Sequence, residues 1–203
     1  MRQRSIDPKA VTLLEAVAQR GRSIQSLSLD TLLETPARKV QGHLDFKRPL
    51  AYRSLQADRR IIALSNQGRD IQLDTLKKTY VKSPFSSTTL RNLLPYLEGW
   101  PELHSEELAY LKYLGTERLG AVTCDVVRGD IVSGLSLGSN GWPTQITRLY
   151  IGPDRLIYRV RNERDGGKDI SQTTYSQVVI NPNLPDSMFL LPPGYTPGPR
   201  SGY

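Results

Sequence analysis

One segment of the sequence has the spacing of a nucleophilic serine. Gly134-Leu135-Ser136-Leu137-Gly138 matches the Gly-x-Ser-x-Gly nucleophile elbow, in which a sharp strand-to-helix turn exposes the serine and the histidine follows later in the chain. Here Ser139–Pro143 come next, a composition that cannot begin a helix, and both histidines precede Ser136. The pattern therefore predicts a Gly/Ser loop between strands and no catalytic residue, and a hydrolase using Ser136 is the weakest functional hypothesis.

Residues that bind metals or phosphates elsewhere are few and scattered in this chain. Cys124 is the only cysteine, so the sequence predicts neither an intrachain disulfide nor a cysteine-rich zinc site. His43 and His104 are far apart and lack ligand-type neighbours, while Glu106 and Glu107 are adjacent and would diverge on a helix. No glycine run precedes Lys-Ser or Lys-Thr. We expect no metal and no cofactor, and a solvated His43.

The chain is basic, with 27 Lys and Arg against 20 Asp and Glu and a formal charge of +7. Such a balance favours anionic partners but is also common on soluble proteins. Five cations gather on one expected hairpin close to three tyrosines: Arg155, Arg159, Arg161, Arg164 and Lys168, with Tyr150, Tyr158 and Tyr175. Interleaved rings and cations can stack single-stranded nucleic acid, but Tyr158 alternates opposite to Arg159. We expect a solvated outer face and no nucleic-acid partner, with anionic lipid headgroups as a further class of contact.

Length and composition indicate one folded domain of moderate size. The chain has 203 residues, of which 38% are hydrophobic, enough for a core without covalent staples. No apolar run approaches the roughly 20 residues of a membrane-spanning helix. No apolar segment follows Arg2 and Arg4 as it would in a signal peptide.

The clearest helix is expected over residues 7–21. Asp7 suits the N-cap, Pro8 the first helical position and Gly21 the C-cap. An apolar stripe recurs at helical spacing and consists of Ala10, Val11, Leu14, Val17 and Ala18. The helix is therefore expected to pack on a sheet.

Most of the remaining chain alternates between apolar and polar residues, as strands do. In Val40–Phe46, the set Val40, Leu44 and Phe46 points one way and the polar residues point the other, which predicts one dry and one wet face. Short turns such as Asn66-Gln67-Gly68 separate the strands. The expected strands are Ser26–Glu34, Val40–Phe46, Leu50–Gln56, Arg60–Asn66, Arg69–Asp74, Lys77–Val81, Tyr113–Leu119, Ala121–Ile131, Thr144–Ile151, Leu156–Arg164 and Lys168–Ile180.

The middle and the end of the chain depart from this pattern. A helix is expected over Thr89–Leu97, kinked or ended by Pro95, and a short helical turn over Ser105–Tyr113. The Pro/Gly-rich tail from Pro192 is expected to be a surface strap or a free end without regular structure. Strands in succession at hairpin spacing predict an α+β, mainly antiparallel fold. Its dry face either closes on a solid core, which the pattern alone favours, or leaves a cavity.

The order of elements carries a resemblance. A capped helix that starts Ile6-Asp7-Pro8-Lys9-Ala10-Val11 comes first, the last strand ends in Tyr175–Asn181, and a closing segment Met188–Tyr195 follows. From about Ile6 to Tyr195 it resembles the LolA/LolB/LppX-like superfamily of bacterial outer-membrane lipoprotein carriers, in particular its predicted periplasmic branch. The resemblance implies a strongly curved, incomplete β-barrel with helices covering the concave face, over a single domain of residues 6–195 between flexible termini (1–5 and 196–203).

The resemblance also implies a function without catalysis. We expect a periplasmic or otherwise extracytoplasmic carrier or sensor that holds lipid or lipoprotein acyl chains, with peripheral membrane contact, its signal peptide lying outside the given sequence. The alternative is an envelope protein-interaction or regulatory module with a solid core. The expected cavity lining, taken from strand and helix phase, is Leu44, Phe46, Ile62, Leu64, Leu73, Leu93, Leu97, Val126 and Tyr158.

Overall fold

The structure is a computed structural model that describes residues 5–49, 51–56, 61–66, 69–83, 103, 108–131, 145–164 and 168–198. The chain divides into two compact units. The first unit comprises Met1–Ser23, Leu33–Lys39 and Arg91–Tyr175, and the second unit comprises Ile24–Leu32, Val40–Leu90 and Ser176–Tyr203. Each unit is described by itself.

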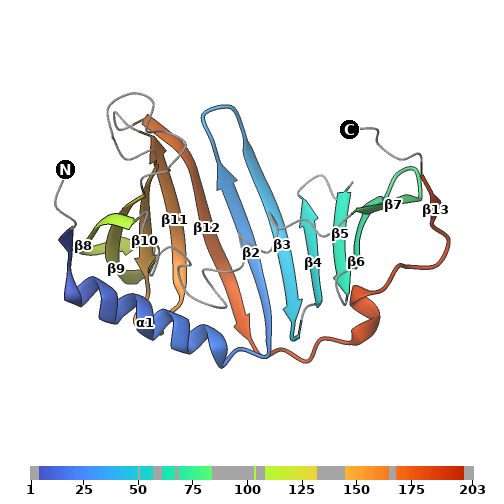
Figure 1. The fold of residues 1–203 in the computed structure, drawn as a ribbon. Coiled ribbons are helices and arrows are strands. Elements are labelled where there is room, and N and C mark those ends of the chain that lie inside the picture. The colour runs from blue at the N-terminus through green and yellow to red at the C-terminus, as the bar shows by residue number, and fades with distance from the viewer. Residues whose placement is uncertain are drawn as a thin grey trace. The chain divides into compact units, whose positions relative to one another are not determined.

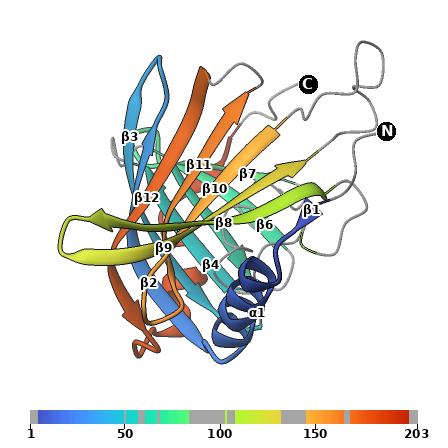
Figure 2. The ribbon, with the colours of Figure 1, turned by 90° about the vertical axis from the view of Figure 1, so that its left-hand side faces the viewer.

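The strands of the first unit follow the hydrogen-bonded order β1-β8-β9-β10-β11-β12 (Figures 1 and 2). They are β1 (Ser5–Ile6), β8 (Leu108–Leu119), β9 (Val122–Ile131), β10 (Gln145–Ile151), β11 (Ile157–Arg164) and β12 (Lys168–Ile180), whose last residues belong to the second unit. All these pairs are antiparallel except β1–β8, which is parallel. Helix α1 (Pro8–Arg22) contacts β8 and buries Ala10, Leu13, Leu14, Val17 and Gly21.

The Asp7 carboxylate joins the start of α1 to strand β8. Its Oδ1 accepts a hydrogen bond from the Lys9 backbone N–H at 2.9 Å, and its Oδ2 accepts one from the Tyr113 N–H at 3.1 Å. The N-cap is therefore the expected residue. The C-cap is not: Gly21 is buried inside the helix, and Ser23 caps it, with its hydroxyl donating to the Arg20 carbonyl at 2.7 Å. The Ser23 hydroxyl thus satisfies a backbone carbonyl of the last helical turn, a role that was expected of a turn at Gly21.

The acid stability of the chain is expected to depend on this carboxylate. The backbone N–H groups of Tyr113 and Lys9 lower the pKa of Asp7 from its ordinary value of 3.8, because both hydrogen bonds favour the charged form. The stabilisation is complete above pH 3.8 and is lost as the pH falls through the lower, folded pKa. In thermal melts from about pH 5 to about pH 2, Asp7→Asn should be less stable at the upper end and converge on the parent at the lower end. Parallel curves would contradict this.

The strands of the second unit follow the order β2-β3-β4-β5-β6-β7-β13. They are β2 (Ser26–Glu34, with its last two residues in the first unit), β3 (Lys39–Lys47), β4 (Ala51–Gln56), β5 (Ile61–Asn66), β6 (Arg69–Asp74), β7 (Thr79–Ser83) and β13 (Thr196–Pro197). The pairs from β3 to β7 are antiparallel, and β13 adds to β7 in parallel.

The strand register places the side chains of this unit on two faces, because directly opposed residues of an antiparallel pair share a face. Phe46 lies opposite Tyr52, and we call their side the Phe46 face. Leu55 lies opposite both His43 and Ile62, and Ile62 in turn lies opposite Leu73. We call this second side the Ile62 face.

The expected wet and dry faces of β3 are both buried near its end. Phe46 is buried on one face, and Asp45, on the other, exposes only 2% of its surface. The expectation of a wet face is therefore wrong at Asp45. A strand covered on both sides can carry a polar residue inward when charged partners reach it from neighbouring strands.

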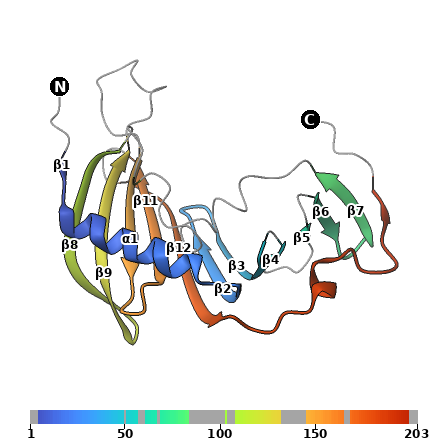
Figure 3. The ribbon, with the colours of Figure 1, turned by 60° about the horizontal axis from the view of Figure 1, so that its bottom comes forward.

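The C-terminal segment is held to the second unit at several points. The Asn181 side chain accepts from the Gln25 N–H at 2.8 Å, and Lys47 forms an ion pair with Asp186 at 2.6 Å in the 3₁₀ helix η3 (Asp186–Phe189). Further along, Thr196 donates its backbone N–H to the Lys78 carbonyl at 3.0 Å. Figure 3 shows this segment running from η3 to β13 beside β7. The expected strap is present, but the expectation that it lacks regular structure is wrong.

The expectation of a mainly antiparallel β fold is confirmed. All eleven expected strands are present, ten of them with end shifts of two residues or fewer and β8 with a start five residues early, and the expected helix over residues 7–21 is α1. The described residues add two short parallel edge strands, β1 and β13. The expected helical turn over Ser105–Tyr113 is wrong from Leu108 onward, because β8 begins there. The expected helix Thr89–Leu97 lies outside the described residues. No described helix combines the length and the hydropathy needed to cross a membrane.

Candidate functional site

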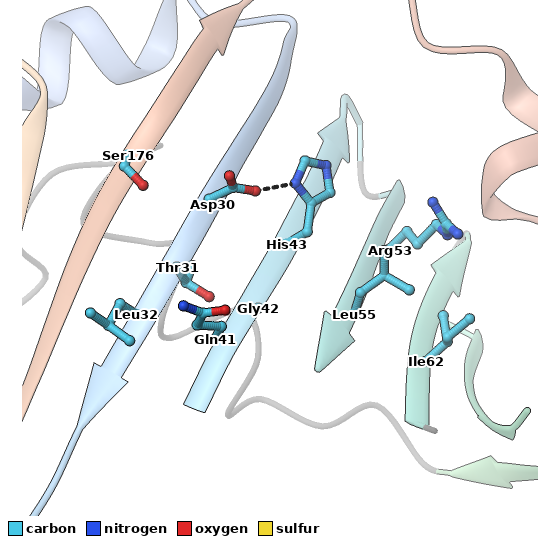
Figure 4. A pocket seen from close by; sticks show the side chains of 10 residues that line it. All are labelled: Asp30, Thr31, Leu32, Gln41, Gly42, His43, Arg53, Leu55, Ile62 and Ser176. Atoms are coloured by element: carbon cyan, nitrogen blue, oxygen red, sulfur yellow. Dashed lines mark hydrogen bonds and ion pairs between the residues drawn. The ribbon is translucent and has the colours of Figure 1, made fainter. Parts of the chain in front are cut away.

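Two adjoining pockets lie on the Ile62 face of the second unit. The first has a volume of about 770 Å³ and is lined from β2, β3, β4, β5 and β12 by Asp30, Thr31, Leu32, Gln41, Gly42, His43, Arg53, Leu55, Ile62 and Ser176 (Figure 4). The second, of about 500 Å³, is lined by Arg53, Ile62, Leu64, Leu73, Ser187, Met188, Leu190, Leu191, Pro192 and Pro193. Because Arg53 and Ile62 line both, the pockets form one feature, which we call the Arg53 groove.

The first pocket is the polar end of the groove and centres on His43. Its Nδ1 lies 2.6 Å from Oδ1 of Asp30, the contact dashed in Figure 4, and its Nε2 lies 3.2 Å from Oδ1 of Asp45. Ser28 donates its hydroxyl to the same Asp45 oxygen at 2.9 Å. His43 was expected to be solvated, but it lies between two carboxylates. Asp45 belongs to the same strand, β3, whereas Asp30 comes from the neighbouring strand β2.

Ser28, His43 and Asp30 have the residue types of a hydrolytic triad, but not its hydrogen bonding. The serine hydroxyl lies 3.2 Å from Nε2 of His43, and a triad requires that nitrogen to accept the hydroxyl proton. Here the hydroxyl donates to the Asp45 carboxylate instead, and Nε2 faces the same oxygen. The cluster is arranged to hold charge in place rather than to activate a nucleophile. Ser136 lies outside the described residues.

Arg53 occupies the junction between the two ends of the groove. Its side chain is 30% exposed, and its Nη1 lies 3.7 Å from Oδ2 of Asp45, an ion pair that is longer than a hydrogen bond. This Oδ2 atom is buried and has no hydrogen-bond partner within the part of the chain that the structure describes. The guanidinium therefore compensates a buried carboxylate, and within the described ranges no hydrogen bond to the protein occupies its N–H donors.

The second pocket is the apolar end of the groove. Leu64 and Leu73 are buried at its base, Ile62 is half-buried, and the C-terminal segment contributes Met188 and Leu191 from above the strands. The same segment contacts β4 and β5 through η3. A surface of this kind can shield an apolar chain from water.

The expected lining residues occupy three different environments. Ile62, Leu64 and Leu73 line the Arg53 groove, whereas Leu44 and Phe46 are buried and on the opposite face. In the first unit, Val126 is buried with Cys124 and Tyr150, and Tyr158 packs against them. Leu93 and Leu97 lie outside the described residues. Leu44, Phe46 and Val126 thus belong to local cores, whereas Tyr158 also lines a separate pocket of about 580 Å³ in the first unit.

Tyr158 also has a polar contact that its strand phase does not reveal. Its hydroxyl donates to Asp154 at 3.0 Å, and burial together with this hydrogen bond raises the pKa of Tyr158 to about 12. Sequence reasoning missed Arg53 and Asp30 as groove residues. Arg53 could have been found from the sequence, because it is two residues from Leu55 and therefore points to the same face of its strand as that apolar residue.

No protein-family model and no curated protein sequence matches this chain. Solved structures do match. MucB has a TM-score of 0.64 at 13% identity over 91% of this chain and 63% of MucB, and the Pseudomonas aeruginosa MucA/MucB complex matches over 60% of the MucB chain. This chain thus spans less than two thirds of MucB.

Two further structures match over nearly their whole length. An uncharacterized conserved protein from Thermus thermophilus has a TM-score of 0.61 at 12% identity, over 93% of this chain and 98% of that protein. The Mycobacterium tuberculosis lipoprotein LppX has a TM-score of 0.59 at 13% identity, over 88% of this chain and 98% of LppX. The chain therefore has the LolA-like fold of MucB and LppX, the fold of the superfamily that its sequence resembles.

Proposed function

We propose that this chain is an extracytoplasmic, non-enzymatic binding protein that holds lipid or lipoprotein acyl chains, as a carrier or sensor. The observation that supports this most directly is the apolar end of the Arg53 groove, where Ile62, Leu64 and Leu73 face the C-terminal segment. The LolA-like fold supports it further, since the resemblance implies an acyl-chain carrier. We include in the proposal a single domain over residues 6–195, built as a strongly curved, incomplete barrel with its helices on the concave face.

The free energy gained by burying an acyl chain is large enough to offset a modest cost of association. Each buried methylene contributes about 0.8 kcal/mol, so a twelve-carbon chain gains on the order of 9 kcal/mol before the costs of association. Those costs are several kcal/mol. With an association cost of about 4 kcal/mol, about 5 kcal/mol remains, which corresponds to a dissociation constant of about 0.2 mM and suits reversible loading and release.

A second candidate function is an envelope protein-interaction or regulatory module without a lipid ligand. The observation that favours it is the match to MucB, a protein whose structure is known in complex with MucA. This candidate predicts a protein partner in an envelope pull-down. It also predicts no shift in melting temperature when single-chain lipids are added.

The test is lipid binding by the purified chain and by a groove variant. Organic extraction followed by mass spectrometry should find copurified lipid, and a fluorescent fatty acid should bind. Ile62→Asn places an amide where both pockets meet, so the affinity for the fatty acid should fall about tenfold or more. Val179→Asn alters an exposed strand residue of the same unit and should leave binding unchanged. Absence of both copurified lipid and probe binding would reject the proposal.

A further inference from the structure

We propose that the Arg53 groove selects single-chain amphiphiles with an anionic end group, which Arg53 binds while the chain lies in the apolar end. This inference rests on the proposed function and adds to it the charge of the ligand and the residue that reads that charge. The shared ligand chemistry is a carboxylate or phosphate at the end of an unbranched hydrocarbon chain.

The first reason is the unused donor capacity of Arg53. A guanidinium carries five N–H donors in a fork that matches carboxylate or phosphate oxygens. The ion pair recorded for it among the described residues is the 3.7 Å contact with Asp45, which is too long for a hydrogen bond. The electrostatic attraction between an anionic ligand and a partly buried guanidinium is stronger than the attraction to a fully hydrated surface arginine, because less water screens it.

The second reason is that the neighbouring charges are already engaged. Oδ1 of Asp30 lies 2.6 Å from Nδ1 of His43, while Oδ1 of Asp45 contacts both the Ser28 hydroxyl and Nε2 of His43. Neither carboxylate has an equally close contact to the Arg53 guanidinium. Among the described residues, Asp30 and Oδ1 of Asp45 are thus held against the imidazole, and Oδ2 of Asp45 lies 3.7 Å from Arg53, beyond hydrogen-bonding distance. The Arg53 guanidinium remains a cation that can donate hydrogen bonds to a ligand.

The third reason is position. Arg53 lines both pockets, and its cross-strand neighbour on β5 is Leu64, a buried residue of the apolar end. An end group bound at Arg53 therefore places the first methylenes beside Ile62 and Leu64 and the rest toward Leu73. A cationic end group in the same place would meet the guanidinium, a like-charge contact that selects against it.

The experiment compares single-chain probes of equal length below their micellar concentrations. Dodecanoate and dodecyl phosphate are the anions, dodecyltrimethylammonium the cation and octaethylene glycol monododecyl ether the neutral probe, each displacing a fluorescent fatty acid. The parent chain should bind the anions roughly tenfold or more tightly than the cation. Arg53→Gln should weaken anion binding about 10- to 100-fold, leave the neutral probe within about twofold, and so report an intact groove. Arg53→Lys should recover part of the loss.

The matched control is Arg148→Gln. Arg148 is also 30% exposed and also lies beside a buried carboxylate, Glu163, at 3.3 Å, but it lines none of the described pockets. This variant should bind every probe as the parent does. Equal affinity of the parent for anionic, neutral and cationic probes, or anion binding unchanged in Arg53→Gln, would overturn the inference while leaving the proposed lipid binding in place. Failure of all probes to bind would overturn both. The ratio of dodecanoate to dodecyl phosphate affinity decides between a fatty acid and a phosphate-bearing lipid.

Discussion

Replacing Phe46 by alanine is expected to lower the free energy of unfolding by about 3–5 kcal/mol, as deletion of a buried aromatic ring does. Phe46 exposes only 2% of its surface and lies across from Tyr52, which is equally buried. Removing the ring forfeits its burial and leaves a cavity against that tyrosine. Since domains of this size are stable by about 5–15 kcal/mol, the loss is a large share of the total.

Urea unfolding followed by circular dichroism measures this loss as a lower midpoint with an unchanged slope. Leu76→Ala is the matched control, because Leu76 is 75% exposed and its truncation should change stability by no more than about 0.5 kcal/mol. The fatty-acid affinity of folded Phe46→Ala should equal that of the parent. If Phe46 lined the ligand site instead, truncation would change the affinity and cost little stability.

The strands of this chain could be predicted closely because alternation and turn residues act locally. β2, β6 and β12 have the expected bounds, since a period of two and flanking turns define where each strand begins and ends. The β8 strand begins before its expected start. Leu108 and Leu111 are both buried there, around a bulge at Leu108/Tyr110, so their spacing of three resembled a helical turn.

The faces and the site could not be predicted in the same way. Alternation separates the two sides of one strand, but it does not say which side of the next strand lies beside it. Only the register shows that Leu55 lies opposite both Ile62 and His43, so that these three residues share one face, and that Phe46 lies on the other face. The contact between Asp30 and His43 likewise joins two strands, and no spacing within one strand encodes it. Thus the groove was predicted in part through Ile62, Leu64 and Leu73, and its polar end was missed.

Asp45→Ala is expected to destabilise the chain by about 2–3 kcal/mol, less than the loss for a fully buried ion pair. The carboxylate is 2% exposed and interacts with Ser28, His43 and Arg53. Breaking a fully buried ion pair costs about 3–5 kcal/mol, because the remaining charge is left without compensation. The cost here is lower, since His43 and Arg53 are each about a third exposed and can turn toward water. The same urea titration measures it.

Asp30→Ala is the control on the other side of the same imidazole. Its contact with His43 is the shorter one, 2.6 Å against 3.2 Å for Asp45, so distance alone would rank it as the stronger. The Asp30 side chain is however 46% exposed, and exposed ion pairs contribute about 0–1 kcal/mol. We therefore expect Asp30→Ala to lose less than about 1 kcal/mol, which is less than the loss for Asp45→Ala. The reverse ranking would mean that water reaches Asp45, and the polar end of the groove would then lack the buried carboxylate that holds Arg53 in place.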